Sequence, residues 1–273
     1  MPGERPFLTA SWTELLMLNF AVPGEVIARL APQGTEPNFF DGQAYVSVVG
    51  FMFRDARFFG FGFPGHRRFE EVNLRYYVRR EVGDSVRRGV VFVREIAPRP
   101  LVAATARWIY NESYVTRRMR NSVHLAGNML AAGDNVGYEW RTGRGAKRYW
   151  NRMAGRVAAA PQRPTPGSLT EFIVEHYWAY VHTRDGGTLE YRVAHRPWRV
   201  APVEEVVWNC DLARSYEHTP LAEYLAAPPV LAFIADGSPV QVFRGRRLEV
   251  PAVQKVDHRF APHLDLTPPV YAE

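Results

Sequence analysis

Residues 70–80 read EEVNLRYYVRR, and the interpretation of the fold depends on this stretch. Its apolar residues occupy alternate positions, which predicts a β-strand. One face of that strand would carry a carboxylate, an amide, a guanidinium and a phenol, from Glu71, Asn73, Arg75 and Tyr77. Either this face meets solvent, with the intervening residues turned toward the core, or it lines an internal pocket. The stretch alone favours the solvated face, and the pocket stays open as the alternative.

The rest of the chain predicts further strands and a few short helices. Apolar alternation predicts strands over 14–22, 40–55, 85–98, 198–208 and 229–243, and a hairpin over 177–195 that turns at 185–187. Short helices are predicted over 23–32, over 100–111 and from Ser168, which has capping-box spacing to Glu171. Gly and aromatic residues over 58–65 (FFGFGFPG) predict a loop.

This order of elements indicates the fold class. Helices do not alternate with strands, which argues against a doubly wound sheet. We therefore expect an α+β protein, rich in antiparallel strands, with short helices at the edges of a large sheet or barrel. The 273 residues are expected to form a single domain, 1–273, in which 245–273 is a Pro-rich C-terminal tail.

Composition narrows the protein class. Hydrophobic residues make up 47% and charged residues 23%, values that are ordinary for a soluble globular protein. The single cysteine, Cys210, excludes an intrachain disulfide and a Cys-rich zinc site. The chain contains no run of about 18 apolar residues, so no membrane span is predicted. The first residues lack the apolar stretch of a signal peptide, so a cytoplasmic location is expected.

Basic residues are mostly arginine. The net charge is +6, and Lys147 and Lys255 are the only lysines among 34 basic residues. A phosphate-binding surface would normally use lysine too, so this bias resembles a coding preference. The densest basic region, 67–88, falls on strands that send its arginines to two opposite faces. No nucleic-acid partner is therefore expected.

Standard motifs for nucleotide, hydrolase and metalloprotease chemistry are missing. The tightest histidine and aspartate group, VDHRFAPHLD at 256–265, lies in the Pro-rich tail, where ligand geometry is hard to hold. We expect neither a metal nor a cofactor.

A second stretch, YNESYVTRRMR at 110–120, crowds phenols and guanidiniums behind the helix predicted over 100–111. It fits an ordinary loop, whose arginines are favoured by the negative C-terminal end of that helix. It also fits a loop that delivers donors to the mouth of a cavity. The residues alone slightly favour the ordinary loop.

Both stretches, with FFDGQAYVSVVGFMF (39–53) and YRVAHRPW (191–198), resemble the YqjF-like group of uncharacterised bacterial proteins. The likeness runs from about Trp12 to Arg247. It rests on the combined spacing of three motifs: E-x-N-x-R from Glu71, two tyrosines (Tyr110 and Tyr114) before Met119, and H-x-P-W from His195.

That group is similar, more distantly, to acetoacetate decarboxylase. The resemblance implies a closed or cone-shaped antiparallel β-barrel with an internal pocket and a few short flanking helices, and a homo-oligomer. The decarboxylase uses a Schiff-base lysine. The corresponding segment here, YVTRRMR, has no lysine, and arginine stays protonated and cannot form an imine. Within such a barrel the Glu71, Asn73 and Arg75 face turns inward, so the resemblance favours the pocket.

We therefore expect an enzyme that acts on a small carboxylate or carbonyl compound by a lyase, isomerase or hydrolase reaction. Glu71 would be the general acid or base, with its pKa raised by burial, and Tyr114 would donate to a developing oxyanion. The remaining candidates would bind substrate: Asn73, Arg75, Tyr110, Arg118, Met119 and His195.

The alternative is a protein that binds or sequesters a hydrophobic organic acid without turnover. The aromatic loop would then close over the ligand as an apolar lid, formed by Phe58, Phe59, Phe61 and Phe63. In both interpretations the partner is a small molecule, with no membrane or nucleic acid.

Overall fold

A computed structural model describes residues 4–62, 67–98 and 114–249. The predicted helix over 100–111, Tyr110, Phe63, Lys255 and the VDHRFAPHLD group therefore lie outside the described residues.

Strands dominate the described chain. They are β1 (Leu8–Val22), β2 (Glu36–Pro37), β3 (Ala44–Phe58), β4 (Arg68–Val82), β5 (Ser85–Ala97), β6 (Tyr114–Thr116), β7 (Met119–Asn121), β8 (Asn135–Thr142), β9 (Tyr149–Val157), β10 (Trp178–His182), β11 (Thr188–His195), β12 (Val200–Asn209), β13 (Leu231–Val242) and β14 (Arg246–Arg247). The short helices are α1 (Gly24–Leu30), α3 (Leu169–Val174) and α4 (Leu212–Ser215), with 3-10 turns η1 (Gly145–Lys147) and η2 (Pro220–Ala226). No helix in the described ranges is long and apolar enough to cross a membrane.

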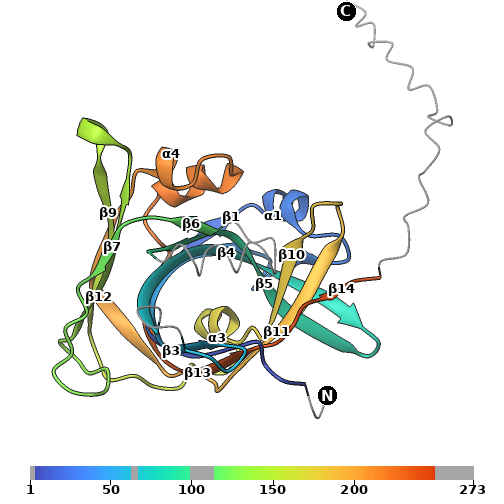
Figure 1. The fold of residues 1–273 in the computed structure, drawn as a ribbon, viewed down its shortest axis with the longest axis horizontal. Coiled ribbons are helices and arrows are strands. Elements are labelled where there is room, and N and C mark those ends of the chain that lie inside the picture. The colour runs from blue at the N-terminus through green and yellow to red at the C-terminus, as the bar shows by residue number, and fades with distance from the viewer. Residues whose placement is uncertain (1–3, 63–66, 99–113, 250–273) are drawn as a thin grey trace, which may run out of the picture.

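Seven strands close into a ring (Figure 1). Their order is β11-β10-β5-β4-β3-β1-β13, and β13 pairs back with β11 through Val193↔Val242 and its neighbours. Every pairing in the ring is antiparallel except β10 with β5. The ring confirms the predicted α+β fold built on an antiparallel-rich barrel or cone. Closure leaves these seven strands without a free edge.

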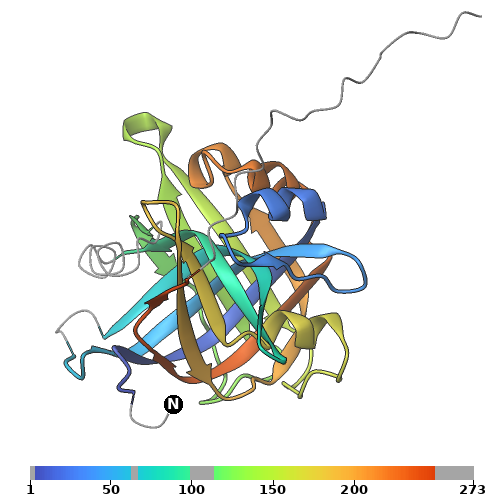
Figure 2. The ribbon, with the colours of Figure 1, turned by 90° about the vertical axis from the view of Figure 1, so that its right-hand side faces the viewer.

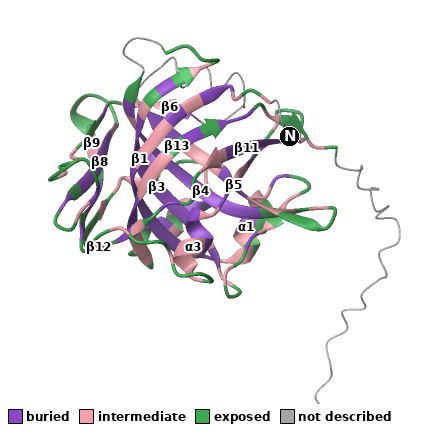
Figure 3. Ribbon diagram, turned by 90° about the horizontal axis from the view of Figure 1, so that it is seen from below, coloured by how far each residue is buried: buried purple, intermediate pink, exposed green. Residues whose placement is uncertain are grey.

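Both faces of β4 are buried, and this resolves the ambiguity of residues 70–80. Val72, Leu74 and Tyr76 join a core on the outer side of the ring. On the inner side, Glu71 is 2% exposed and Arg75 is 8% exposed. The interpretation of a solvated polar face is therefore wrong, and the polar row faces the interior of the ring. Figure 3 shows the buried strands of the ring in purple.

The outer core is covered by a second sheet. From β13 the strands continue as β12-β9-β8-β7, which turn back across the outer side of β1 and β3. Tyr138 on β8 donates its hydroxyl to the backbone carbonyl of Glu14, at 2.8 Å. Its ring lies directly against Gly50 on β3. A side chain at position 50 would occupy the space of the Tyr138 ring.

A β-bulge sets which residues of β5 face the interior. Between Leu74↔Arg94 and Arg75↔Phe92 the register shifts by one residue. Phe92 and Glu95 therefore both lie on the inner face, although simple alternation from Phe92 would place Glu95 outside. Similar shifts occur where β1 pairs with β3.

Helix α3 fills one end of the ring (Figures 1 and 2; yellow in Figure 2). The predicted start is confirmed, since the Ser168 hydroxyl accepts from the backbone N–H of Glu171 at 3.2 Å. Phe172 packs in the inner core, and Arg88 donates to its carbonyl at 3.0 Å. The C-terminal carbonyls of α3 therefore point at guanidinium groups, which a helix end favours.

The start of the predicted tail belongs to the sheet. Arg246 and Arg247 form β14, which pairs with Glu190 and Leu189 of β11. The rest of the tail, 250–273, lies outside the described residues.

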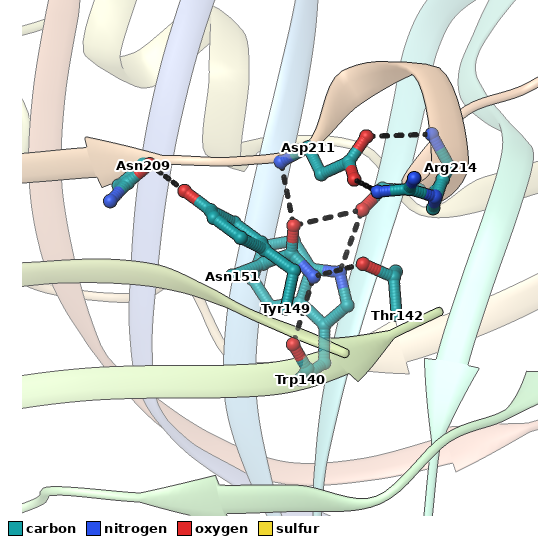
Figure 4. Close-up of polar contacts among 8 residues, drawn as sticks. Trp140, Thr142, Tyr149, Asn151, Asn209, Asp211 and Arg214 are labelled. Carbon is teal, nitrogen blue, oxygen red and sulfur yellow. Dashed lines mark hydrogen bonds and ion pairs between the residues drawn. The ribbon is translucent and has the colours of Figure 1, made fainter. Parts of the chain in front are cut away.

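A hydrogen-bonded cluster joins the second sheet to α4 (Figure 4). The Asn151 amide donates to the carbonyl of Trp140 at 2.9 Å and to Thr142 at 3.2 Å. Its oxygen accepts from the backbone N–H of Asp211 at 2.7 Å and from Ser215 at 3.3 Å. Because this buried amide uses both its donor and its acceptor, we interpret the cluster as structural.

Replacing Gly50 by Ala should weaken the packing of the second sheet against the ring. The added Cβ would lie 2.4 Å from a ring carbon of Tyr138, so the ring must shift. We expect a loss of about 1–3 kcal/mol in the free energy of unfolding, measured by urea denaturation. Gly127→Ala is the control, since its Cβ would meet nothing within 4 Å. Equal stability of the two variants would contradict this packing.

Candidate active site

The interior of the ring holds a cavity with about 790 Å³ of empty space, including its opening to solvent. Most of its wall is apolar or aromatic: Phe7, Leu8, Trp12, Leu15, Val49, Phe51, Phe53, Phe58, Phe69, Phe92, Tyr191, Val193 and Val242. The polar wall is formed by Glu71, Asn73, Arg75, Glu95 and Tyr114. An apolar cavity with a few convergent polar groups is the usual form of a small-molecule site.

Strand register brings the polar wall together. Asn73 on β4 is directly opposite Glu95 on β5, and Glu95 is paired in turn with Tyr114 on β6. Directly opposite residues on one face lie about 5 Å apart. The polar side chains therefore come from three neighbouring strands whose relative positions are fixed by backbone hydrogen bonds.

Glu71 accepts hydrogen bonds from two of its neighbours. The Tyr114 hydroxyl donates to Oε2 of Glu71 at 2.6 Å. The Asn73 amide donates to Oε1 of the same carboxylate at a longer 3.4 Å. Two donors on one carboxylate hold its orientation. Glu71 and Tyr114 thus form a preset pair at the polar wall.

Arg75 is a buried cation without an acidic partner. Within the part of the chain that the structure describes, no carboxylate lies within 4 Å of its guanidinium. Its Nη2 donates to the carbonyl of Ile173 at 3.4 Å and lies 3.8 Å from Sδ of Met17. Its Nε has no hydrogen-bond partner among these residues. Buried charges are normally paired, so Arg75 is suited to receive an anion.

Two predicted binding residues do not reach the cavity. Arg118 is exposed, and Met119 packs in the outer core. The reason is topological, because the chain leaves the ring between β6, which pairs with β5, and β7, which pairs with β8. We therefore exclude both residues from the candidate site, and the position of Tyr110 is not described.

His195 does not line the cavity either. Its ring stacks on Trp198 with centroids 4.2 Å apart, and Trp198 in turn contacts Trp12, which does line the cavity. Burial lowers the pKa of His195. His195 therefore contacts the wall only through Trp198 and Trp12.

The aromatic loop contributes one residue to the cavity. Phe58 lines it, whereas Phe59 and Phe61 are 51% and 72% exposed. In this arrangement the described part of the loop does not form the expected four-residue lid.

Glu95 is a cavity residue that the sequence did not indicate. It is 3% exposed and lies opposite Asn73. Alternation along VVFVREIAP places it on the opposite side from Phe92, and only the bulge brings both inside. A bulge of this kind leaves no clear signal in a single sequence.

Other reactive groups are less suited to chemistry. Burial raises the pKa of the Cys210 thiol to about 12, so the thiolate is not formed at neutral pH. Lys147 is exposed on η1, in the second sheet's hairpin. Among the described residues, no group of three or more histidine, cysteine or acidic side chains is arranged to hold a metal ion.

His176 is buried behind the polar wall. Its pKa lies well below the usual histidine range, mainly because of burial and secondarily because of the guanidiniums of Arg88 and Arg75. Its ring packs 4.7 Å from that of Tyr77. His176 therefore stays neutral in the folded protein at pH values where an exposed histidine would be charged.

A comparison with protein families shows the family to which the chain belongs. Residues 9–239 match a family, DUF2071, described as an uncharacterized conserved protein (COG2071). The chain belongs to the DUF2071 family. A curated relative is the uncharacterized protein YqjF of Bacillus subtilis (strain 168), 26% identical over 197 residues, which cover 71% of this chain and 75% of YqjF. The family resemblance inferred from the three motifs is confirmed.

Solved structures support the fold. An acetoacetate decarboxylase-like enzyme from Sphingomonas wittichii RW1 has a TM-score of 0.60 at 15% identity, covering 89% of this chain and 92% of that one. Acetoacetate decarboxylase from Legionella pneumophila gives 0.59 at 11% identity, with 91% and 92% covered. The enduracididine biosynthesis enzyme MppR complexed with pyruvate gives 0.60 at 12% identity, with 89% and 90% covered. The DUF2071 chain therefore has an acetoacetate decarboxylase-like fold.

His176 should make stability depend on pH. The unfolded chain takes up a proton near pH 6.5, whereas folded His176 does so only at a lower pH. Its contribution is therefore fully present above pH 6.5 and is lost as pH falls toward its folded pKa. As the pH falls from 7 to 5.5, the free energy of unfolding should decrease less in His176→Gln than in the wild type. Below pH 6.5, the difference should grow by up to about 1.4 kcal/mol per pH unit.

The measurement is urea denaturation of both proteins across this pH range. His218→Asn is the control, because His218 is exposed and has a left-handed backbone that Asn tolerates. Identical pH dependence in wild type and His176→Gln would show that His176 titrates normally.

Proposed function

We propose that the protein binds a small organic acid in the ring cavity and transfers a proton to or from it through Glu71. The supporting observation is Arg75, a buried guanidinium beside Glu71 and Asn73 that has no carboxylate partner among the described residues. A ligand carboxylate would supply the missing charge, held by a guanidinium whose planar donors suit it. The aromatic walls would enclose the apolar body of the ligand.

In the proposed chemistry, Glu71 is the general base or acid. As a carboxylate it takes a proton from the bound compound or from water, and as an acid it returns one. Tyr114, which donates to Glu71, redirects its hydroxyl to an oxygen that gains negative charge in the transition state. Proton transfer of this kind begins lyase and isomerase reactions and activates water in hydrolase reactions.

The structural neighbours support the ligand class. MppR has been solved in complex with pyruvate, a small 2-oxo acid. Transfer of that ligand class to this chain is part of the proposal, since the shared identity is 12%. A Schiff base is not part of it, because no lysine lines the cavity within the described ranges.

A second function is binding without turnover. It is favoured by the largely aromatic wall and by the hydrogen bonds that Glu71 already receives from Tyr114 and Asn73. A carboxylate satisfied in this way can serve to shape a pocket. The same organic acids would then bind and leave unchanged.

A panel of 2-oxo, 2-hydroxy and unsubstituted acids separates the two functions. Thermal stabilisation identifies the acids that bind, since a ligand specific for the folded state raises the melting temperature. Each hit is then followed for chemical change by NMR. Binding with turnover supports the enzyme, binding alone supports the sequestering protein, and no binding contradicts both.

Glu71→Gln tests the role of the carboxylate. The amide keeps the size of the side chain but cannot exchange a proton, so we expect turnover of a hit to fall by about 10²–10⁴-fold, with binding changed much less. Glu204→Gln is the matched control, because Glu204 is a surface partner of Arg156. Full turnover by Glu71→Gln would refute the assignment.

We further propose that the protein is cytoplasmic and that it forms a homo-oligomer, which the resemblance to acetoacetate decarboxylase implies. Sedimentation velocity of the purified chain at several concentrations measures the assembly state. A monomer at all concentrations would contradict this part.

A further inference from the structure

Glu71 determines which way the Asn73 amide points. A carboxylate only accepts hydrogen bonds, so the Asn73 atom 3.4 Å from Oε1 of Glu71 must be the amide nitrogen. Tyr114 donates to the other oxygen of Glu71, which fits the same acceptor role. The Asn73 oxygen is therefore the atom left over, and it accepts no hydrogen bond from the described residues.

Arg75, on the same face of β4, has a donor that lacks an acceptor. Its Nε is a buried donor that meets no acceptor in the described part of the chain. Residues two apart on a strand lie about 7 Å apart on one face, and both line the cavity. The Asn73 oxygen is thus an unused acceptor and the Arg75 Nε an unused donor on a cation, both on the wall of one cavity.

We propose that the acid bound at this site carries a hydroxyl group next to its carboxylate, that is, a 2-hydroxy acid. The carboxylate accepts from Arg75, and the hydroxyl donates to the oxygen of Asn73. A 2-oxo acid satisfies Arg75 but places a second acceptor against the Asn73 oxygen. Leaving a buried polar atom unpaired weakens binding, so the site discriminates in favour of the hydroxyl. This inference rests on the proposed function and narrows its ligand class.

Binding requires only a small exchange of contacts at Arg75. The present hydrogen bond from Nη2 to the carbonyl of Ile173 is long, 3.4 Å, and its contact with the Met17 sulfur is weak. Replacing them by charge-assisted bonds to a carboxylate is favourable. The guanidinium can therefore exchange these two weak contacts for the ligand while it keeps its place 5.6 Å from the centroid of the Tyr77 ring.

The rest of the cavity favours an aromatic group on the ligand. Phe53 and Phe69 stack with ring centroids 4.6 Å apart, and Phe51 lies 5.2 Å from Phe53. These rings line the wall near Glu71, with which Phe51 is paired across the strands. A phenyl group can pack against such a surface in offset or edge geometry. We therefore choose 3-phenyllactate as the probe.

The experiment compares four acids that share one phenylpropionate skeleton. They are 3-phenyllactate in both enantiomers, 3-phenylpyruvate, 3-phenylpropionate, and 2-fluoro-3-phenylpropionate. The fluorine is close in size to a hydroxyl but cannot donate a hydrogen bond. Dissociation constants are measured by titration calorimetry on the full chain. We expect one enantiomer of phenyllactate to bind at least tenfold more tightly than each of the other acids.

Asn73→Leu tests the assigned residue. The leucine removes the acceptor at similar size, so the preference for the hydroxyl should vanish while 3-phenylpropionate binds as it does to the wild type. Thermal melting without ligand confirms that the variant folds. Should it not fold, the fluoro and hydroxy acids on the wild-type protein still test the need for a donor.

The possible outcomes separate this inference from the proposed function. If none of these four acids binds but another acid of the wider panel does, the organic-acid site stands and this inference is refuted. If no acid of either set binds, the proposed function fails and the inference with it. If the acids bind with equal affinity, the organic-acid site stands and the hydroxyl preference is refuted. If the preference survives in Asn73→Leu, the assignment to Asn73 is refuted.

Discussion

A polar row buried inside a closed ring of strands is the constraint on which the rest of the structure depends. Placing Glu71, Asn73 and Arg75 away from water is costly unless each finds partners. Tyr114 and the carbonyl of Ile173 supply part of them. The opposite face of β4 is buried too, so the strand cannot slip by one residue without exchanging polar and apolar side chains between two cores.

The local features of the fold could be read from the sequence. The strand predicted over 70–80 agrees with β4 to within two residues at each end, the hairpin predicted over 177–195 is formed by β10 and β11, and Ser168 caps α3. These features follow from alternation, turn residues and capping, which act over a few positions. Alternation could not show that both faces of β4 are buried, because apolar residues on one face do not prove that the other face is exposed to solvent. Ring closure and the second sheet depend on pairings between distant segments.

The candidate site could be predicted only in part from the sequence. Glu71 and Tyr114 stand out within their own stretches, the family resemblance favours a pocket for them, and they meet in a hydrogen bond. Arg118 and Met119 lie only a few residues beyond Tyr114, yet the chain has already crossed to the second sheet. Proximity in sequence therefore misled where the strands change partners. Glu95 was missed for the converse reason, since it is distant in sequence from Glu71 and enters through an irregular ladder.

That irregular ladder in β5 has a consequence for the electrostatics of the interior. With uninterrupted pairing beyond Phe92, Arg94 would project into the ring and Glu95 would reach the exterior, where Arg94 now donates to the carbonyl of Glu217. One extra backbone residue thus decides whether an anion or a cation occupies that point. Relatives with identical side chains but a displaced bulge would enclose an oppositely charged chamber, so alignment of residues alone would not reveal the change in chemistry.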